Sequence, residues 1–289
     1  MKVLKLIIVS VLLTCLSCKE EPKIQVDWVS STNDKLWETK TYKGAIEAEW
    51  SQISIQLDIN KTQQTIDGFG GCFNELGWDA LGMVTPEEKQ QILNDLFDTE
   101  DGCKFNICRM PIGANDYAVD WYSHNETNGD FAMENFSIDR DKKRLIPYIK
   151  EAQKINPDVQ VWASPWCPPS WMKHSKHYAS KSNPEFNDLP EEWSSTEELV
   201  SRFITEPEYF ESYALYFSKF IQAYEEEGID IYAVHVQNEP NSAQNFPSCV
   251  WKPEDLGILI ADYLVPKFKA DNLDTEIWLG TIERPQLER

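Results

Sequence analysis

One short segment holds the side chains best suited to acid–base chemistry. It runs Val236-Gln237-Asn238-Glu239-Pro240, an apolar stretch that ends in an amide, a carboxylic acid and a proline. Proline ends strands because it has no N–H to donate to a neighbouring strand. A glutamate half buried at such a strand end has its neutral form favoured by desolvation, as a general acid requires. An ordinary surface glutamate in a strand-end turn is the alternative.

Two further segments carry residues that could serve the same site. In the stretch 109–117, Arg109 could hold a catalytic carboxylate ionised by charge pairing, and Asp116 could bind hydroxyl groups. In the stretch 162–172, prolines fix the backbone around Trp166 and lower the entropy cost of holding its indole ring. A fixed indole offers a flat face to a sugar ring, although most tryptophans fill cores. For Asp116 the alternative is a loop cap, since aspartate favours such turns.

Short apolar runs alternate with helical patterns through most of the chain. A threonine, a proline and two acids at 85–88 predict the start of a helix. Aromatic and aliphatic residues at helical spacing predict an amphipathic helix over 208–227, and further helices are expected near 141–155 and 253–270. The five expected strands are 64–73, 105–110, 159–166, 231–237 and 276–282.

Strands that alternate with helices are typical of parallel sheets, so the fold class is α/β. An open doubly wound sheet and a (β/α)8 barrel both fit this pattern. The first strand ends in Gly68-Phe69-Gly70-Gly71, which lacks the G-x-G-x-x-G spacing of dinucleotide-binding doubly wound sheets. Long loops after the strands favour a TIM barrel, in which the carboxyl ends of the strands carry the chemistry. Because five of eight units cannot close a barrel, we expect an incomplete one.

The N-terminus has the features of an export signal. Two lysines precede the apolar run 6–13, which is too short to span a bilayer. The pattern that ends at Cys18 resembles a bacterial lipoprotein signal, in which Cys18 becomes the lipidated first residue. We therefore expect residues 1–18 to be a signal peptide and residues 19–30 a tether. The expected location is the bacterial outer membrane or cell surface, with ordinary secretion as the alternative.

Charge and cysteine content narrow the class of partner. The formal net charge of −21 argues against nucleic acid, which binds basic patches, and leaves membrane contact to the N-terminal lipid anchor alone. Of the seven cysteines, five follow Cys18 without a CxxC pair, and the four histidines add no ligand spacing. Neither a metal nor another cofactor is expected. One disulfide is possible, and the odd count leaves at least one free thiol.

Four motifs follow one another along the chain: Asp67-Gly68-Phe69-Gly70-Gly71, the stretch 109–117, Ser164-Pro165-Trp166 with Trp171-Met172-Lys173, and Gln237-Asn238-Glu239-Pro240. In this order they resemble the motifs of glycoside hydrolase family 30, which includes glucosylceramidases and endo-β-1,6-glucanases. The Asn-Glu-Pro motif is shared by a larger group of related barrels, and the glycine turn together with the Ser-Pro-Trp loop narrows the resemblance to this family. The resemblance runs from about Thr65 to the end of the chain.

The resemblance implies a retaining β-glycosidase, in which Glu239 is the acid/base and Asn238 contacts the sugar 2-hydroxyl. It also implies that Asp116 and Trp166 contact the non-reducing sugar. The family's nucleophile is a second glutamate after a seventh strand, and Glu283, after the fifth, does not fit that role. We therefore expect the nucleophile beyond residue 289. The chain of 289 residues alone is expected to lack ordinary glycosidase activity.

The resemblance further implies the domains and the substrate class. Residues 31–60 would be a β-strand segment of a small side β-sandwich, and residues 61–289 a partial barrel. A β-linked glycan of the β-glucoside or β-1,6-glucan type is the expected substrate, with the loops 121–128 and 174–193 shaping its outer subsites. Two alternatives stay open: a non-catalytic surface glycan-binding lipoprotein, and a barrel of a neighbouring family with its second carboxylate elsewhere.

Overall fold

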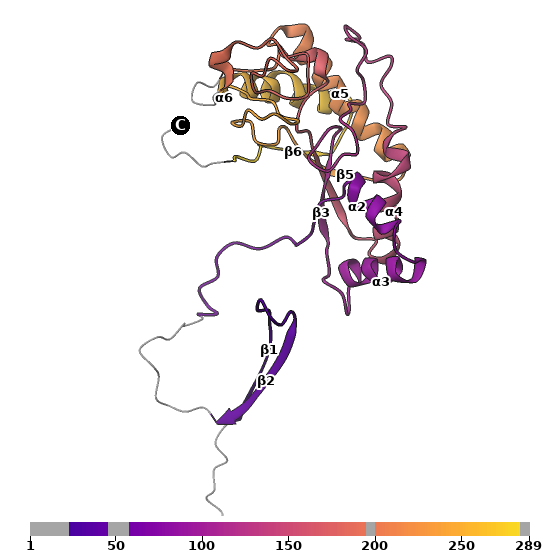
Figure 1. Cartoon of the computed structure of the whole chain (residues 1–289), viewed down its shortest axis with the longest axis vertical. Helices are drawn as coiled ribbons and strands as arrows, with labels where there is room; N and C mark the ends of the chain where they lie inside the picture. Colours follow the sequence, from indigo (N-terminus) through magenta and orange to yellow (C-terminus); the bar gives the residue numbers. More distant parts are fainter. Residues whose placement is uncertain (1–22, 46–57, 195–199, 284–289) are drawn as a thin grey trace, which may run out of the picture. The chain divides into compact units, whose positions relative to one another are not determined.

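The computed structural model describes residues 23–45, 58–194 and 200–283, and the chain divides into two units after Thr65 (Figure 1). In the first unit, β1 (Lys23–Ser30) and β2 (Glu38–Ala45) form an antiparallel hairpin. Strand β1 lies wholly within residues 19–30, which were expected to be a tether, because its alternation of apolar and polar residues already suits a strand. Cys18 and the alternating segment 53–57 lie outside the described residues.

The second unit is built on a parallel sheet whose strand order follows the sequence. Strands β3 (Ile107–Pro111), β4 (Gln160–Ser164), β5 (Ile231–His235) and β6 (Glu276–Trp278) are neighbours in that order. A doubly wound sheet reverses its strand order at a switch point, and these four strands show no reversal. The order is that of a barrel wall, which agrees with the predicted (β/α)8 class.

The expected first strand, 64–73, is an irregular edge segment rather than a regular strand. It runs along β3, where the Arg109 N–H donates to the Gly71 carbonyl oxygen at 2.9 Å. Gly70 permits this approach, because a Cβ at that position would lie 1.9 Å from the Ile107 carbonyl oxygen. The prediction was therefore right about the position of the segment and wrong about its regularity, since glycine weakens strand pairing.

The expected helices are present, and Figure 1 shows the long α5 with α2, α3 and α4 beside the strands. Among the described residues none of the helices is long and apolar enough to cross a membrane. Short helical turns accompany them at η1 (Asp141–Lys143), η2 (Ser170–Met172) and η3 (Glu191–Ser194). The helices are α2 (Glu75–Leu81), α3 (Pro86–Phe97), α4 (Leu145–Ile155), α5 (Pro207–Glu226), α6 (Pro253–Ile258) and α7 (Val265–Ala270), the last two joined by the π-helical η4 (Leu259–Leu264).

Aromatic side chains of α5 form much of the core beneath the sheet. Tyr213, Phe217 and Phe220 are fully buried in one cluster with Val161 of β4 and Val234 of β5. This face is the one that the helical spacing predicted. It holds the helix against the strands and so fixes the level at which the strand ends emerge.

The start of α3 follows the capping pattern expected from its sequence. The Glu88 N–H donates to Thr85 Oγ1 at 3.2 Å, and the Thr85 N–H donates to Glu88 Oε2 at 2.9 Å. Both N–H groups would otherwise lack a partner within the helix.

Loss of the Thr85 hydroxyl should destabilise the fold measurably. We predict that Thr85→Ala lowers the free energy of unfolding by about 1 kcal/mol, because the Glu88 N–H loses its acceptor. Urea denaturation followed by circular dichroism measures the change. Thr85→Ser keeps the hydroxyl and is the matched control. Equal stability of the Ala and Ser variants would contradict a role for the cap.

Candidate active site

The carboxyl ends of three neighbouring strands bring Arg109, Ser164 and Asn238 together. Arg109 Nη2 donates to Ser164 Oγ at 2.6 Å and to Asn238 Oδ1 at 2.8 Å. Arg109 Nε also donates to Ser164 Oγ at 2.9 Å. The guanidinium therefore joins β3, β4 and Asn238, which lies three residues after the end of β5. Among these contacts it touches an amide and a hydroxyl rather than the catalytic carboxylate expected from sequence.

Glu239 follows Asn238 in a backbone conformation that few residues adopt. Its φ of 49° lies in the left-handed region, where a non-glycine residue is strained by about 1–3 kcal/mol. The Glu239 N–H donates to Thr281 Oγ1 at 3.3 Å, and Thr281 Oγ1 donates to Asn238 Oδ1 at 3.3 Å. Pro240 accepts from the Trp251 N–H at 2.8 Å. Contacts on both sides thus hold the strained residue in place.

The surroundings of Glu239 favour its protonated form. Burial raises the pKa of Glu239, and the negative charges of Glu283 and Asp116 raise it further. The positive charge of Arg109 lowers the pKa of Glu239 but does not reverse the shift. Glu239 thus has the direction of shift that a general acid needs.

Trp166 and Asp116 lie in the same site and contact each other. Trp166 Nε1 donates to Asp116 Oδ2 at 3.2 Å, and the Arg109 guanidinium lies 4.2 Å from the centre of the indole ring. Gln237 Nε2 donates to the Trp166 carbonyl oxygen at 2.7 Å. The indole is fixed, as expected, but only 7% exposed, because Arg109 covers part of it. The sugar-binding roles of Trp166, Asp116 and Asn238 stay predictions.

A layer of aromatic rings lies beneath the site, and the sequence analysis did not assign it. The Trp162 ring centre lies 5.3 Å from that of His235 and 5.5 Å from that of Trp278. Burial, together with the charge of Arg109, lowers the pKa of His235 to about 4, so this histidine is neutral near pH 7. The sequence did contain one indication of this aromatic layer. Trp162 lies two residues before Ser164, so its side chain is on the same face of β4 as that of Ser164.

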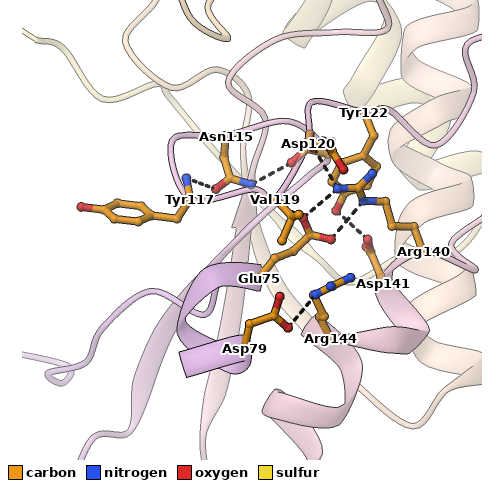
Figure 2. Close-up of polar contacts among 11 residues, drawn as sticks. Glu75, Asp79, Asn115, Tyr117, Val119, Asp120, Tyr122, Arg140, Asp141 and Arg144 are labelled. Carbon is orange, nitrogen blue, oxygen red and sulfur yellow. Dashed lines mark hydrogen bonds and ion pairs between the residues drawn. The ribbon is translucent and has the colours of Figure 1, made fainter. Parts of the chain in front are cut away.

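The loop that carries Asp116 is fastened to α2 by a buried carboxylate. Figure 2 shows Glu75 facing Arg140, which donates to both of its carboxylate oxygens at 3.0 and 2.9 Å. Glu75 Oε2 also accepts from the Val119 N–H at 2.8 Å, and Arg140 donates to the Asp120 carbonyl oxygen at 2.9 Å. Helix α2, which the sequence analysis missed, therefore positions the loop next to the site.

Metal-binding side chains do not cluster in the described part of the chain. No group of three or more His, Cys, Asp or Glu residues that could hold a metal ion occurs there. The five cysteines in that part, Cys72, Cys103, Cys108, Cys167 and Cys249, are all free thiols.

Comparisons with known proteins agree with this geometry. The model of the glycosyl hydrolase family 30 TIM-barrel domain matches residues 66–279. The chain is 30% identical to an endo-1,6-beta-D-glucanase of Trichoderma harzianum over 78% of its own length and 45% of the relative's. It is 28% identical to the lysosomal acid glucosylceramidase of Mus musculus, over 69% and 36% of the two lengths.

Solved structures of other proteins have a similar fold. An endo-beta1,6-glucanase matches with a TM-score of 0.65 and 31% identity, over 77% of this chain and 46% of that one. The protein SrfJ from Salmonella typhimurium matches with a TM-score of 0.70 over 89% of this chain, and at 24% identity it supports the fold alone. The chain thus spans about half or less of the length of these relatives.

The Glu75 contact should contribute more to stability than a neighbouring ion pair on the same helix. We predict that Glu75→Ala lowers the free energy of unfolding by about 3 kcal/mol, because Arg140 and the Val119 N–H lose a buried partner. Asp79→Ala removes the more exposed pair with Arg144 and should cost less than about 1 kcal/mol. Urea denaturation of both variants measures the difference, and equal losses would contradict it.

Removal of the positive charge of Arg109 and removal of the negative charge of Asp116 should shift the pKa of Glu239 in opposite directions. Arg109→Met is expected to raise the pKa of Glu239, and Asp116→Asn to lower it, since one loses a cation and the other an anion. A pH titration of the Glu239 carboxyl carbon by NMR measures both. Arg109→Lys keeps the charge and should raise the pKa less than Arg109→Met. Shifts of the same sign in the Met and Asn variants would refute the arrangement.

Proposed function

The chain belongs to glycosyl hydrolase family 30, and we propose that its site hydrolyses β-glycosidic bonds with Glu239 as general acid and base. The observation that carries the proposal is the position of Glu239. It lies four residues after the end of β5, half buried, with its backbone held by Thr281 and its pKa raised by burial. Catalytic residues of TIM barrels occupy such strand ends.

In the proposed reaction Glu239 transfers a proton twice. It first protonates the glycosidic oxygen while a second carboxylate attacks the anomeric carbon and displaces the leaving group, forming a glycosyl–enzyme bond. The ionised Glu239 then removes a proton from water, which attacks the same carbon, releases the second carboxylate and retains the configuration. Asn238, oriented by the guanidinium of Arg109, donates from its amide nitrogen to the 2-hydroxyl of the sugar.

The second carboxylate lies about 5–5.5 Å from the first in retaining enzymes. Asp116 is engaged with Trp166 Nε1, which suits a role in sugar binding rather than attack. Glu283 follows β6, whereas the resemblance assigns the nucleophile to a later strand. The proposal therefore gives the role of nucleophile to neither Asp116 nor Glu283, and keeps for it the second glutamate of a later strand that the resemblance implies.

The proposed substrate is a β-linked glucan of the β-1,6 type, reached by an exported protein. Two relatives, one by sequence and one by structure, are named endo-1,6-glucanases, and both are at least 30% identical to this chain. Export and lipidation at Cys18, proposed on the N-terminal pattern, would bring the site to polysaccharide outside the cell.

Removal of the acid should matter most where the leaving group needs a proton. In the full-length protein, Glu239→Ala is expected to lower kcat/KM on a β-glucan about 100- to 10,000-fold. Its loss on a 2,4-dinitrophenyl β-glucoside should be much smaller for the glycosylation step, because that leaving group departs without protonation. Azide should restore turnover and yield a β-glycosyl azide.

A matched control separates this effect from general damage. Glu254, an exposed acid in the first turn of α6, lies on another element, and Glu254→Ala should keep both activities. Equal losses on the two substrates in Glu239→Ala, or no response to azide, would count against Glu239 as the acid/base.

A further inference from the structure

Four aromatic side chains gather on the loops that follow β3 and β4. The Trp121 ring centre lies 5.8 Å from that of His177 and 6.3 Å from that of Tyr178. The His177 ring in turn stacks on Phe186 at 4.7 Å. Trp121 is 41% exposed although it is supported by these neighbours. These four residues are called the aromatic ledge below.

The aromatic ledge belongs to the loops that also carry the site. Trp121 lies in the same loop as Asp116, fastened at Val119 and Asp120 by the Glu75–Arg140 pair. On the other side, the N–H groups of residues 180 and 181 donate to the Gln244 carbonyl oxygen at 3.2 and 3.0 Å. Gln244 follows Glu239 by five residues. The ledge therefore borders both loops that hold the proposed chemistry.

A buried lysine fixes the ledge from beneath. Lys173 is fully buried, and its Nζ donates to the carbonyl oxygens of Tyr178 at 2.5 Å and Ser248 at 2.7 Å. Within the described ranges, no carboxylate forms an ion pair with this ammonium group, and burial lowers the pKa of Lys173. Such burial is costly, and here it ties the ledge to the loop after β5. A binding surface ordered in advance loses less entropy when a ligand binds.

The ledge also offers polar groups beside its rings. His177 Nδ1 accepts from the Ala179 N–H at 3.1 Å, so the hydrogen of the neutral ring is on Nε2. Burial, assisted by the charge of Lys173, lowers the pKa of His177 and favours this neutral form. Burial, and next the negative charge of the exposed Glu126, raise the pKa of the Tyr178 hydroxyl, which stays protonated as a donor. Flat apolar faces with a donor and an acceptor at their edge suit the C–H face and hydroxyls of a pyranose.

We infer that the aromatic ledge is a subsite for a further glucose unit of a β-linked glucan, with Trp121 as its principal contact. The inference rests on the proposed function and narrows it, because a substrate of several sugar units fills this subsite and a single glucoside leaves it empty. Affinity should therefore increase with the length of the glucan, and Trp121 should carry that increase.

The test compares two sugar lengths in the full-length protein carrying Glu239→Gln, which prevents turnover. Isothermal titration calorimetry measures the binding of a β-1,6-linked glucose disaccharide and tetrasaccharide. Trp121→Ala should weaken the tetrasaccharide about tenfold and the disaccharide less than about threefold. Trp121→Phe, which keeps a ring, should stay within about threefold for both sugars. Trp37→Ala removes a 75% exposed tryptophan outside the second unit and is the matched control.

The outcomes separate the subsite from the catalytic proposal. Equal losses for the two sugars in Trp121→Ala, or no loss, overturn the subsite while the proposed function stands. Absence of binding to either sugar, together with absence of hydrolysis by the protein with Glu239 intact, overturns both. If Trp121→Ala fails to fold by circular dichroism, His177→Ala must show the same dependence on length, and its absence overturns the subsite.

Discussion

The arrangement of the site depends on the contacts that the guanidinium group of Arg109 makes. This group reaches from β3 to Ser164 and Asn238 and lies against the ring of Trp166, so one side chain sets the relative position of three strand ends. A shift of β3 by one residue would turn Arg109 to the opposite face of the sheet and break every one of these contacts. The positive charge of Arg109 also lowers the pKa of Glu239, but burial raises that pKa by more.

Two buried charges hold the loops around that centre, and they are satisfied in different ways. Glu75 is matched by a bidentate arginine and a backbone N–H, which compensates most of its desolvation. Lys173 has backbone carbonyl oxygens as its partners, so its burial is less fully compensated. Both side chains lie beneath loops that carry site residues. The buried contacts of Glu75 and Lys173 therefore hold these loops in place without a bound ligand.

The sequence predicted which segments meet, because that depends on local pattern and on the rule that parallel strands present their carboxyl ends together. Arg109, Trp166 and Asn238 were grouped correctly for this reason. Helix α2 was missed, since seven residues are too few for a periodic pattern to be clear. The enclosure of Trp166 and the contact of Thr281 with Asn238 join residues far apart in the chain, and only the register of the folded strands decides them.

The consecutive order of β3, β4, β5 and β6 has a consequence for how the protein is made. Each of β4, β5 and β6 pairs with the strand synthesised just before it, so each of these three meets a partner that has already left the ribosome. Loop closure then spans one helix at a time, which keeps its entropy cost low. The sheet can therefore grow in the direction of translation. At each stage its growing edge is the strand that was added last, and only that strand waits for the next partner.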